Sequence, residues 1–324
     1  MIEKNNKMFA DILMCTYNGE DFIELQIQSI LDQTHTDFKL IIVDDSSNDR
    51  TVEIIEKMML NDKRIELHQN KKNIGYFNNF LNGLDLVKSD YLFFSDQDDI
   101  WAKNKVEIQL ADLMLEDDTV LMNFSNSYLL YDKIQSEPNY ETKRDPSKIK
   151  TYYSSPIELA LRNIVAGHTI LIRSNQIPSI KKSLSNITDI KNLYFDYILT
   201  LVILDLGQVK YIDESFVYFR QHVESTSTKM RMNYFKYVST NAHAFSQISV
   251  SAKTATYFSV LNKAIVKRTN FPAYIKLLYQ NLIHRNALVS NYDFYQIDTK
   301  PSFFSKIRMN FKLCRLIYLQ KTNR

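Results

Sequence analysis

Glycine is scarce in this chain: its 324 residues include five. The sequence accordingly lacks the GxGxxG dinucleotide fingerprint, the GxxxxGK[ST] phosphate loop and the GxSxG nucleophile elbow, each of which needs glycines at fixed spacing. An HExxH zinc motif is also absent. The chemistry of this protein must therefore be sought in other residue patterns.

Cysteine and long apolar runs are also scarce. The two cysteines, Cys15 and Cys314, are far apart, so they form no CxxC site, and a reduced, cytosolic state is the simplest interpretation. No run of about 18 apolar residues occurs, so no transmembrane helix is predicted. The first residues show no charged-then-apolar signal pattern. We therefore expect a cytoplasmic protein.

The overall composition is that of a globular protein, with 45% hydrophobic and 24% charged residues. The small net charge of +3 hides a division along the chain. Residues 1–228 hold 24 Lys and Arg against 35 Asp and Glu, whereas residues 229–324 hold 16 against two. This division predicts an acidic N-terminal domain, 1–228, and a basic C-terminal module, 229–324, in which apolar and aromatic residues recur at helical spacing.

Short apolar runs alternate with longer amphipathic stretches through the first 125 residues. The polar residues 132–156 are expected to form a loop or a crossing segment. Alternation of strands and helices predicts an α/β fold with a mostly parallel sheet, whose ligands bind beyond the carboxyl ends of the strands. The expected strands are 9–16, 38–43, 64–68, 91–94, 164–173, 209–212 and 215–219, and the expected helices are 20–33, 51–60, 76–87, 103–115 and 192–206.

Polar clusters follow the first two expected strands, at residues 15–19 and 44–47. Adjacent parallel strands bring such turns together. A carboxylate there can accept hydrogen bonds from a base or a ribose, and Tyr17 can stack on a base. The alternative interpretation is that Asp44 and Ser46 cap the helix that follows.

An acidic cluster, Asp96, Asp98 and Asp99, follows the strand at 91–94. Carboxylates so close together repel one another, and a hard divalent cation such as Mg²⁺ or Mn²⁺ would offset that repulsion. The alternative is a solvated turn in which Asp99 caps the next helix.

Two further candidates lie near the end of the acidic domain. Asp196 stands beside aromatic residues at the start of an apolar helix, and a partly desolvated carboxylate suits general-base chemistry. The alternative is an acidic residue favoured by the helix dipole. His222 follows the last expected strand and is either a metal ligand or an ordinary histidine.

The order and spacing of these clusters resemble family 2 inverting glycosyltransferases of GT-A fold, over residues 9 to about 225. The forms SDQDDIW and YFRQH most resemble bacterial rhamnosyltransferase-like members that build cell-wall or capsular polysaccharides. The matching segments are ILMCTYNGEDFIELQIQSILDQT, FKLIIVDDSSNDRT, NIGYFNNFLNGL, DYLFFSDQDDIWAKNK and FDYILTLVILDLGQVKYIDESFVYFRQH.

The resemblance implies a mixed, mostly parallel sheet flanked by helices, and a role for each matching residue. A divalent metal, Mg²⁺ or Mn²⁺, is the implied cofactor. The implied contacts of the nucleotide base are Cys15, Tyr17 and Asp45, with neighbouring Asn18 and Asp44, and those of the nucleotide-sugar are Asn73, Gly75 and Asn82. The implied DxD pair is Asp96 and Asp98 around Gln97, with Asp98 the direct metal ligand. Asp196 is the implied catalytic base, and His222 is implied to lie near the diphosphate and metal.

The resemblance leaves the substrate open. Relatives often have His-Asp at the base, where this chain has Phe195 and Asp196, so a contact with the acceptor or sugar is expected to differ. The first expected donor is dTDP-rhamnose; a UDP-hexose or UDP-N-acetylhexosamine is the alternative. Sugar-nucleotide synthesis is disfavoured, because CTYNGEDF replaces the glycine- and arginine-rich loop of such enzymes. An inactive homologue acting as a scaffold is the non-enzymatic alternative.

The last stretch of the chain, 299–324, contains seven Lys and Arg and no acidic residue, with aromatic residues at steps of three or four. Such a helix suits an anionic membrane surface. We therefore expect a lipid-linked glycan acceptor at the inner face of the bacterial plasma membrane. The alternative is packing on the acidic domain or a second subunit, giving a homo-oligomer. A nucleic-acid partner is not expected, because no recognition module is evident.

Overall fold

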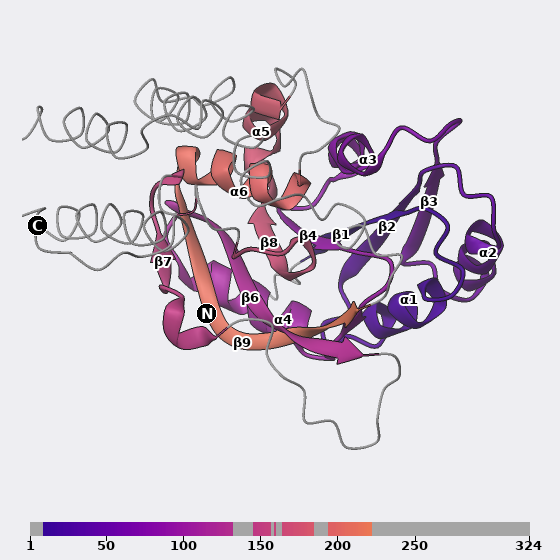
Figure 1. Cartoon of the computed structure of the whole chain (residues 1–324), viewed down its shortest axis with the longest axis horizontal. Coiled ribbons are helices and arrows are strands. Elements are labelled where there is room, and N and C mark those ends of the chain that lie inside the picture. Colours follow the sequence, from indigo (N-terminus) through magenta and orange to yellow (C-terminus); the bar gives the residue numbers. More distant parts are fainter. Residues whose placement is uncertain (1–8, 132–144, 157–158, 160–163, 185–193, 222–324) are drawn as a thin grey trace, which may run out of the picture.

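The computed structural model describes residues 9–131, 145–156, 159, 164–184 and 194–221. A nine-stranded mixed sheet runs through them in the order β3-β2-β1-β4-β8-β6-β9-β5, with β7 paired to β9 (Figure 1). The N-terminal part alternates strands and helices, as the sequence predicted. Its elements are β1 (Ala10–Thr16), α1 (Ile23–Leu31), β2 (Phe38–Asp44), α2 (Thr51–Asn61), β3 (Ile65–Gln69), α3 (Tyr76–Gly83) and β4 (Tyr91–Ser95), with a 3₁₀ turn at Leu84–Leu86.

Strands β1 to β4 are mutually parallel where they pair, and the remaining strands add antiparallel pairs. Strand β8 is antiparallel to β4 and β6, β9 is parallel to β6, and β5 and β7 are antiparallel to β9. These later elements are β5 (Ile100–Trp101), α4 (Lys105–Leu115), β6 (Val120–Tyr131), β7 (Tyr152–Tyr153), β8 (Ile170–Arg173), α5 (Ile177–Leu184), α6 (Phe195–Leu206) and β9 (Gln208–Gln221), with 3₁₀ turns at Pro146–Lys148, Gly167–Thr169 and Ser174–Gln176.

Helices cover both faces of the sheet and create two apolar cores. Strand β1 shows why: successive side chains alternate, so Leu13 enters one core and Ile12 the other. The first core is packed by α3, α5 and α6, and the second by α1, α2 and α4 (Figure 1). This arrangement confirms the predicted α/β fold and leaves the strand ends free to form a site.

Three sequence predictions need correction. The strand expected at 164–173 begins at Ile170, because Gly167–Thr169 forms a 3₁₀ turn in which the Thr169 N–H donates to the Ala166 carbonyl. The two strands expected at 209–212 and 215–219 are one strand, β9, whose register against β6 shifts at the bend around exposed Asp213. Strand β6 was not predicted, because buried polar residues such as Asn123 interrupt its apolar pattern.

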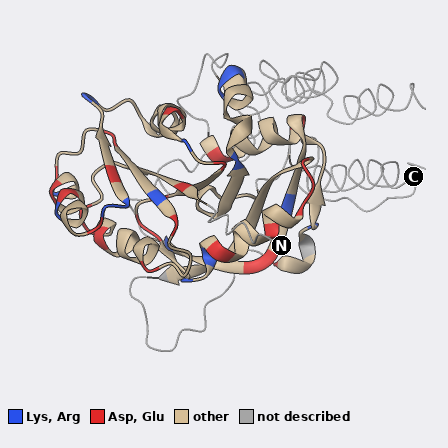
Figure 2. Ribbon diagram, turned by 180° about the vertical axis from the view of Figure 1, so that it is seen from behind, with Lys and Arg blue, Asp and Glu red and all other residues tan. Residues whose placement is uncertain are grey.

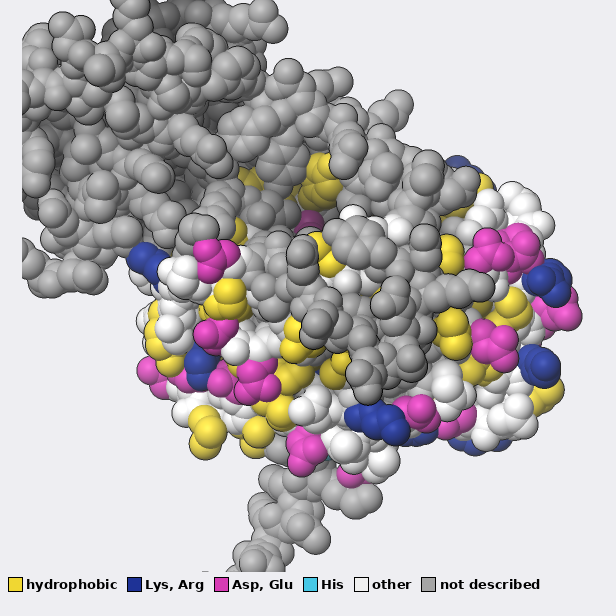
Figure 3. Space-filling view, turned by 60° about the horizontal axis from the view of Figure 1, so that its bottom comes forward, with side chains coloured by type: hydrophobic (Ala, Val, Ile, Leu, Met, Phe, Trp, Pro, Cys, Tyr) yellow, Lys and Arg dark blue, Asp and Glu magenta, His cyan; other side chains and the backbone are white. Residues whose placement is uncertain are grey.

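Residues 132–144 and the C-terminal module lie outside the described residues, as do His222 and the basic stretch 299–324. The division at residue 228 therefore stays a prediction. Acidic and basic residues are interspersed over the described part, and hydrophobic side chains are scattered among them on the face seen in Figure 3 (Figures 2 and 3). Among the helices that the structure describes, none is long and apolar enough to span a bilayer.

Candidate active site

The loops after β1, β2 and β4 meet at one edge of the sheet. Residue pairing places Thr16 beside Asp44 and Met14 beside Ser95, so the three parallel strands end close together. The polar clusters that the sequence analysis selected follow these ends. The structure thus brings the nucleotide-contact and acidic clusters to the edge where α/β proteins bind ligands.

Gln97 fastens the loop that follows β1. The Tyr17 N–H donates to Gln97 Oε1 at 2.8 Å, and Gln97 Nε2 donates to the Tyr17 carbonyl at 3.2 Å. A Cβ on Gly19 would lie 2.6 Å from Gln97 Oε1, so a larger residue there would displace the Gln97 amide from this position. The Tyr17 side chain remains exposed, which leaves it accessible for stacking on a base.

Asp44 and Asn18 link the loops after β1 and β2. Asp44 accepts from the Thr16 hydroxyl at 3.0 Å and from the Ser47 N–H at 2.9 Å. The Asn18 N–H donates to Ser47 Oγ at 2.9 Å. Helix α2 begins at Thr51, whose N–H donates to Asp49 Oδ1 at 3.0 Å, so the alternative that Asp44 caps this helix is wrong. Asp44 instead joins the two strand ends.

Asp45 holds the loop that leads into α3. Its buried carboxylate accepts from Asn70 Nδ2 at 2.9 Å, from the Ile74 N–H at 2.9 Å and from the Gly75 N–H at 2.8 Å. Gly75 has a φ of +86°, a conformation that favours glycine. Two of these bonds go to Oδ1 and one to Oδ2, so Oδ2 retains capacity for one more donor, such as a base N–H.

The asparagines of the α3 region divide by burial. Asn73 and Asn82, both predicted contacts of the nucleotide-sugar, are exposed, and neither bonds to the other candidate residues described. Asn79, which the sequence analysis did not select, is buried. It accepts from Asn70 Nδ2 at 2.8 Å and donates to the Val43 carbonyl at 2.9 Å. Its position next to Phe80, on the apolar face of the helix, was the sequence feature that could have identified Asn79 as a buried residue.

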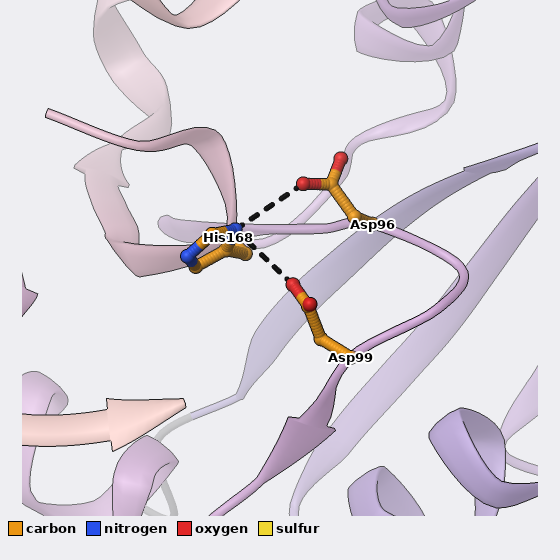
Figure 4. Close-up of side chains that lie close together, drawn as sticks. All are labelled: Asp96, Asp99 and His168. Atoms are coloured by element: carbon orange, nitrogen blue, oxygen red, sulfur yellow. Dashed lines mark hydrogen bonds and ion pairs between the residues drawn. The ribbon is translucent and has the colours of Figure 1, made fainter. Parts of the chain in front are cut away.

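The acidic loop after β4 is joined to a histidine far along the chain. His168 Nδ1 lies 3.3 Å from Asp96 Oδ2 and 3.1 Å from Asp99 Oδ2 (Figure 4). Asp99 is buried, and the first turn of α4 donates instead to Gln33, through the Val106 N–H at 3.0 Å, so the alternative of a solvated turn with Asp99 as cap is wrong. The sequence analysis gave His168 no role, because its pairing with Asp96 spans 72 residues.

Arg220, near the end of β9, ties that strand to the acidic loop. Its N–H donates to Asp99 Oδ1 at 3.0 Å, and its Nε donates to the Asp98 carbonyl at 2.8 Å. Its guanidinium lies 5.0 Å from the centre of the Phe22 ring. The main chain around Asp98 is therefore held by Arg220 of β9, which precedes His222 by two residues in the sequence.

Asp196 lies in the first turn of α6 and contacts the turn Gly167–Thr169, hereafter the GHT turn. Its Oδ2 accepts from the Gly167 N–H at 3.1 Å, and its Oδ1 accepts from the Tyr197 N–H at 2.7 Å. These bonds orient the carboxylate. Because His168 follows Gly167, one short turn connects the predicted base with the acidic loop.

The neighbouring Phe195 belongs to the core. Its ring packs 5.2 Å from Phe80, 5.5 Å from Phe77 and 5.8 Å from Phe94, measured between ring centres, and it is 2% exposed. The ring is enclosed by α3 and β4, and the expectation that a contact with acceptor or sugar differs at this position stays a prediction. Phe195 anchors the start of α6 and so positions Asp196.

Tyr76 is a further site residue that the sequence analysis missed, although it follows Gly75 directly. A Cβ built on Gly167 would lie 3.6 Å from Asp196 Cβ and 3.9 Å from the Tyr76 hydroxyl. Burial, followed by the charges of Asp96 and Asp196, raises the pKa of Tyr76 well above its usual value. The phenol is therefore a neutral hydrogen-bond donor near both carboxylates.

Cys15 completes this electrostatic picture. Burial, then the charges of Asp96 and Asp45, raises the pKa of its thiol well above the usual value. A neutral thiol is a poor nucleophile and a poor metal ligand. The thiol is therefore not suited to covalent chemistry, and the contact of Cys15 with the nucleotide stays a prediction.

The residues of the acidic loop fit a divalent cation. Ligand atoms of Asp96, Asp99 and His168 lie within 4.8 Å of one another. Asp96 and Asp98 offer the hard oxygen ligands that Mg²⁺ and Mn²⁺ take together with phosphate oxygens. The metal-ligand assignment of Asp98 stays a prediction, and that of His222 lies outside the described residues.

The sheet order and the strand-end site define an α/β protein of the GT-A, nucleotide-diphospho-sugar transferase class. Residues 11–173 match the sequence model described as glycosyl transferase family 2, and the chain belongs to that family. In fold the chain is similar to residues 1–349 of S. aureus TarS, solved in complex with UDP-GlcNAc, with a TM-score of 0.56, 16% identity and coverage of 81% of this chain and 72% of that one. The predicted family and fold are confirmed.

Curated relatives carry different substrate names. The chain is 35% identical over 146 residues to dTDP-rhamnosyl transferase RfbG of Shigella flexneri, covering 40% of this chain and 48% of that protein. It is 29% identical over 257 residues to the UDP-Glc:alpha-D-GlcNAc-diphosphoundecaprenol beta-1,3-glucosyltransferase WfaP of Escherichia coli, covering 75% and 88%. With four of the curated relatives, the match spans between 32% and 48% of their own length.

Proposed function

We propose that this protein transfers a sugar from a nucleoside diphosphate donor to a glycan acceptor in bacterial polysaccharide synthesis, with inversion and with a divalent cation. The observation that carries the proposal is the GHT turn. Gly167 bonds to Asp196 and His168 to Asp96, so a prospective base and a prospective diphosphate site share one short segment.

In this proposal Asp196 takes the proton from the attacking hydroxyl of the acceptor. The N–H groups of Gly167 and Tyr197 hold the carboxylate in place, in an orientation from which it can take the proton. No second carboxylate acts as a nucleophile, so the hydroxyl displaces the diphosphate directly and the anomeric configuration inverts. A divalent cation held by Asp96 and Asp98 would offset the charge of the departing diphosphate.

The first candidate donor is dTDP-rhamnose, supported by the SDQDDIW motif and by the similarity to RfbG. The second is UDP-glucose, favoured by the similarity to WfaP, which extends over 75% of this chain. The name of that relative also supports a lipid-linked acceptor for this chain. Asp45 does not discriminate between the donors, because uracil and thymine present the same N3–H and carbonyls.

Asp196→Asn tests the proposed base. The amide keeps the size of the side chain but cannot take a proton, so transfer should fall by about 10²-fold or more while nucleotide affinity stays unchanged. Both oxygens of Asp196 accept from main-chain N–H groups, so the new NH₂ group faces one of these donors and the melting temperature should fall modestly. The readouts are released nucleoside diphosphate, glycan product and thermal melting.

Asp118→Asn, at an exposed position beyond the end of α4, is the matched control and should leave transfer unchanged. Near-normal transfer by Asp196→Asn would contradict the assignment of the base. The alternative, a non-catalytic scaffold, predicts that the purified wild-type protein neither transfers sugar nor hydrolyses any donor with Mg²⁺ or Mn²⁺.

A further inference from the structure

We propose that His168 is a positioning residue that sets the orientation of Asp96, and that buried Asp99 fixes His168 in turn. The inference rests on the proposed function, in which Asp96 belongs to the metal and diphosphate site. It assigns a role to a residue that stands apart from the acidic loop in the sequence and reaches it only through the fold (Figure 4).

The arrangement around one ring nitrogen identifies its hydrogen. His168 Nδ1 lies 3.3 Å from Asp96 Oδ2 and 3.1 Å from Asp99 Oδ2. Two carboxylate oxygens would repel an unprotonated nitrogen, so Nδ1 carries a hydrogen; its hydrogen bond goes to Asp96 Oδ2, and Asp99 Oδ2 makes a close charge contact with the same nitrogen. The other ring nitrogen lies 3.5 Å from Ser127 Oγ, a much weaker contact.

The imidazole is held firmly by its surroundings. Its ring stacks on Phe219, with 4.9 Å between ring centres and 24° between planes. Asp99 is held by the Arg220 N–H at 3.0 Å. The main chain of the GHT turn is held by Gln109 Nε2, which donates to the Thr169 carbonyl at 3.0 Å. The Nδ1 donor therefore has a fixed position.

Asp96 is the one member of this trio that reaches solvent. Its side chain is 28% exposed, against 2% for His168 and 1% for Asp99. One of its oxygens contacts His168, and the other points away from the ring in Figure 4 and has no hydrogen-bond partner among the described residues. His168 thus presents one oxygen of Asp96 to whatever binds at the loop.

A pre-oriented carboxylate binds more tightly, because less rotamer freedom is lost on binding. Groups that orient metal ligands from behind typically contribute 10–100-fold to metal affinity or activity. We therefore expect His168 to act on Mn²⁺ binding and on turnover, through Asp96. Direct ligation by His168 is the competing role, and the choice of variants separates the two.

The experiment compares His168→Phe with His168→Asn. Phenylalanine keeps the stacking on Phe219 and removes the donor, whereas the asparagine amide can place an N–H near the position of Nδ1. Mn²⁺ affinity is measured from the free-ion electron paramagnetic resonance signal, with and without nucleoside diphosphate. We expect His168→Phe to weaken Mn²⁺ binding roughly 10–100-fold and to lower kcat, with His168→Asn recovering most of the loss.

His68→Phe, at a partly exposed histidine on β3 that pairs with Glu66, is the matched control and should bind Mn²⁺ normally. If His168→Phe fails to fold, His168→Gln replaces it. The amide of the longer glutamine side chain lies toward Ser127, as Nε2 does, so it should not restore the donor at the position of Nδ1. Normal Mn²⁺ affinity in the variant without the donor overturns the inference. Equal loss in His168→Asn also overturns it and assigns direct ligation.

Asp98→Asn separates this inference from the proposed function. Loss of Mn²⁺ affinity in Asp98→Asn with normal affinity in His168→Phe overturns the role of His168 alone. Normal Mn²⁺ affinity in Asp98→Asn contradicts the metal site on which the proposed function depends, and the role of His168 fails with it.

Discussion

Asp45 shows how one side chain can organise a site from several elements. It follows β2 and accepts hydrogen bonds from Asn70, Ile74 and Gly75, all of which lie in the loop between β3 and α3. The sequence motif identified Asp45 as a nucleotide contact. Its three partners were not predicted, because they lie 25 to 30 residues further along the chain.

Asp45→Asn is expected to destabilise the protein. If the amide oxygen replaces Oδ1, the new NH₂ group faces the Gly75 N–H, and one buried donor loses its acceptor. The cost of such a loss is about 1–3 kcal/mol. Urea denaturation measures it, and Asp118→Asn again serves as the exposed control. Unchanged stability would contradict the observed bonding of this carboxylate.

The GHT turn is the element that joins the site. Gly167 bonds to Asp196, His168 to the acidic loop and Thr169 to Gln109. The apolar residues around it, from Ile164 to Ile172, predicted a strand through the whole segment. The turn forms instead because β8 pairs with β4 only from Leu171 to Arg173, so the chain before it is free to bend over the strand ends.

Helix α4 begins with a buried lysine. Lys105 bonds to Gln109 and lies 4.6 Å from the centre of the Trp101 ring, and burial lowers its pKa well below the usual value. The unfolded chain therefore binds more protons than the folded one at pH values between the folded pKa and about 10.4, and stability rises with pH through that window.

Lys105→Met is expected to remove this contribution. The free energy of unfolding of the wild type should increase relative to that of the variant as the pH is raised from 7 toward 9.5, with other groups contributing equally to both. Denaturation with urea at several pH values measures the difference. Parallel pH profiles would contradict the shifted pKa of Lys105.

Ligand binding should stabilise the folded molecule as a whole, since it acts on the native state alone. A donor at 100 times its dissociation constant adds about 2.7 kcal/mol. For a protein of this size that raises the melting temperature by several degrees, at about 2–4 °C per kcal/mol. We expect this shift with the correct nucleotide sugar and Mn²⁺ or Mg²⁺, and its loss on adding EDTA. An EDTA-insensitive shift would contradict metal dependence.

The basic stretch 299–324 predicts an interaction of the whole protein with a surface. Its cations and periodic aromatic residues should give salt-sensitive binding to anionic liposomes in a flotation assay. Neutral phosphatidylcholine liposomes are the control. An absence of binding to anionic liposomes would remove the membrane hypothesis and leave packing against the acidic domain or a second subunit.

The family, the α/β alternation and the acidic and nucleotide-contact motifs were readable in the amino-acid order, because each depends on residues close together in the chain. Asp96 and Asp45 belong to contiguous motifs at strand ends, and Asp196 begins an apolar helix. Tyr76 and Asn79 entered the site only through the fold, and His168 and Arg220, the latter from the YFRQH segment, received no role until the fold showed their partners. Their partners come from other strands and helices, and hydrophobic periodicity does not encode which distant turn packs over which strand end. The placement of His168 against Asp96 and Asp99 arises from the pairing of β8 beside β4, a contact between segments about 80 residues apart.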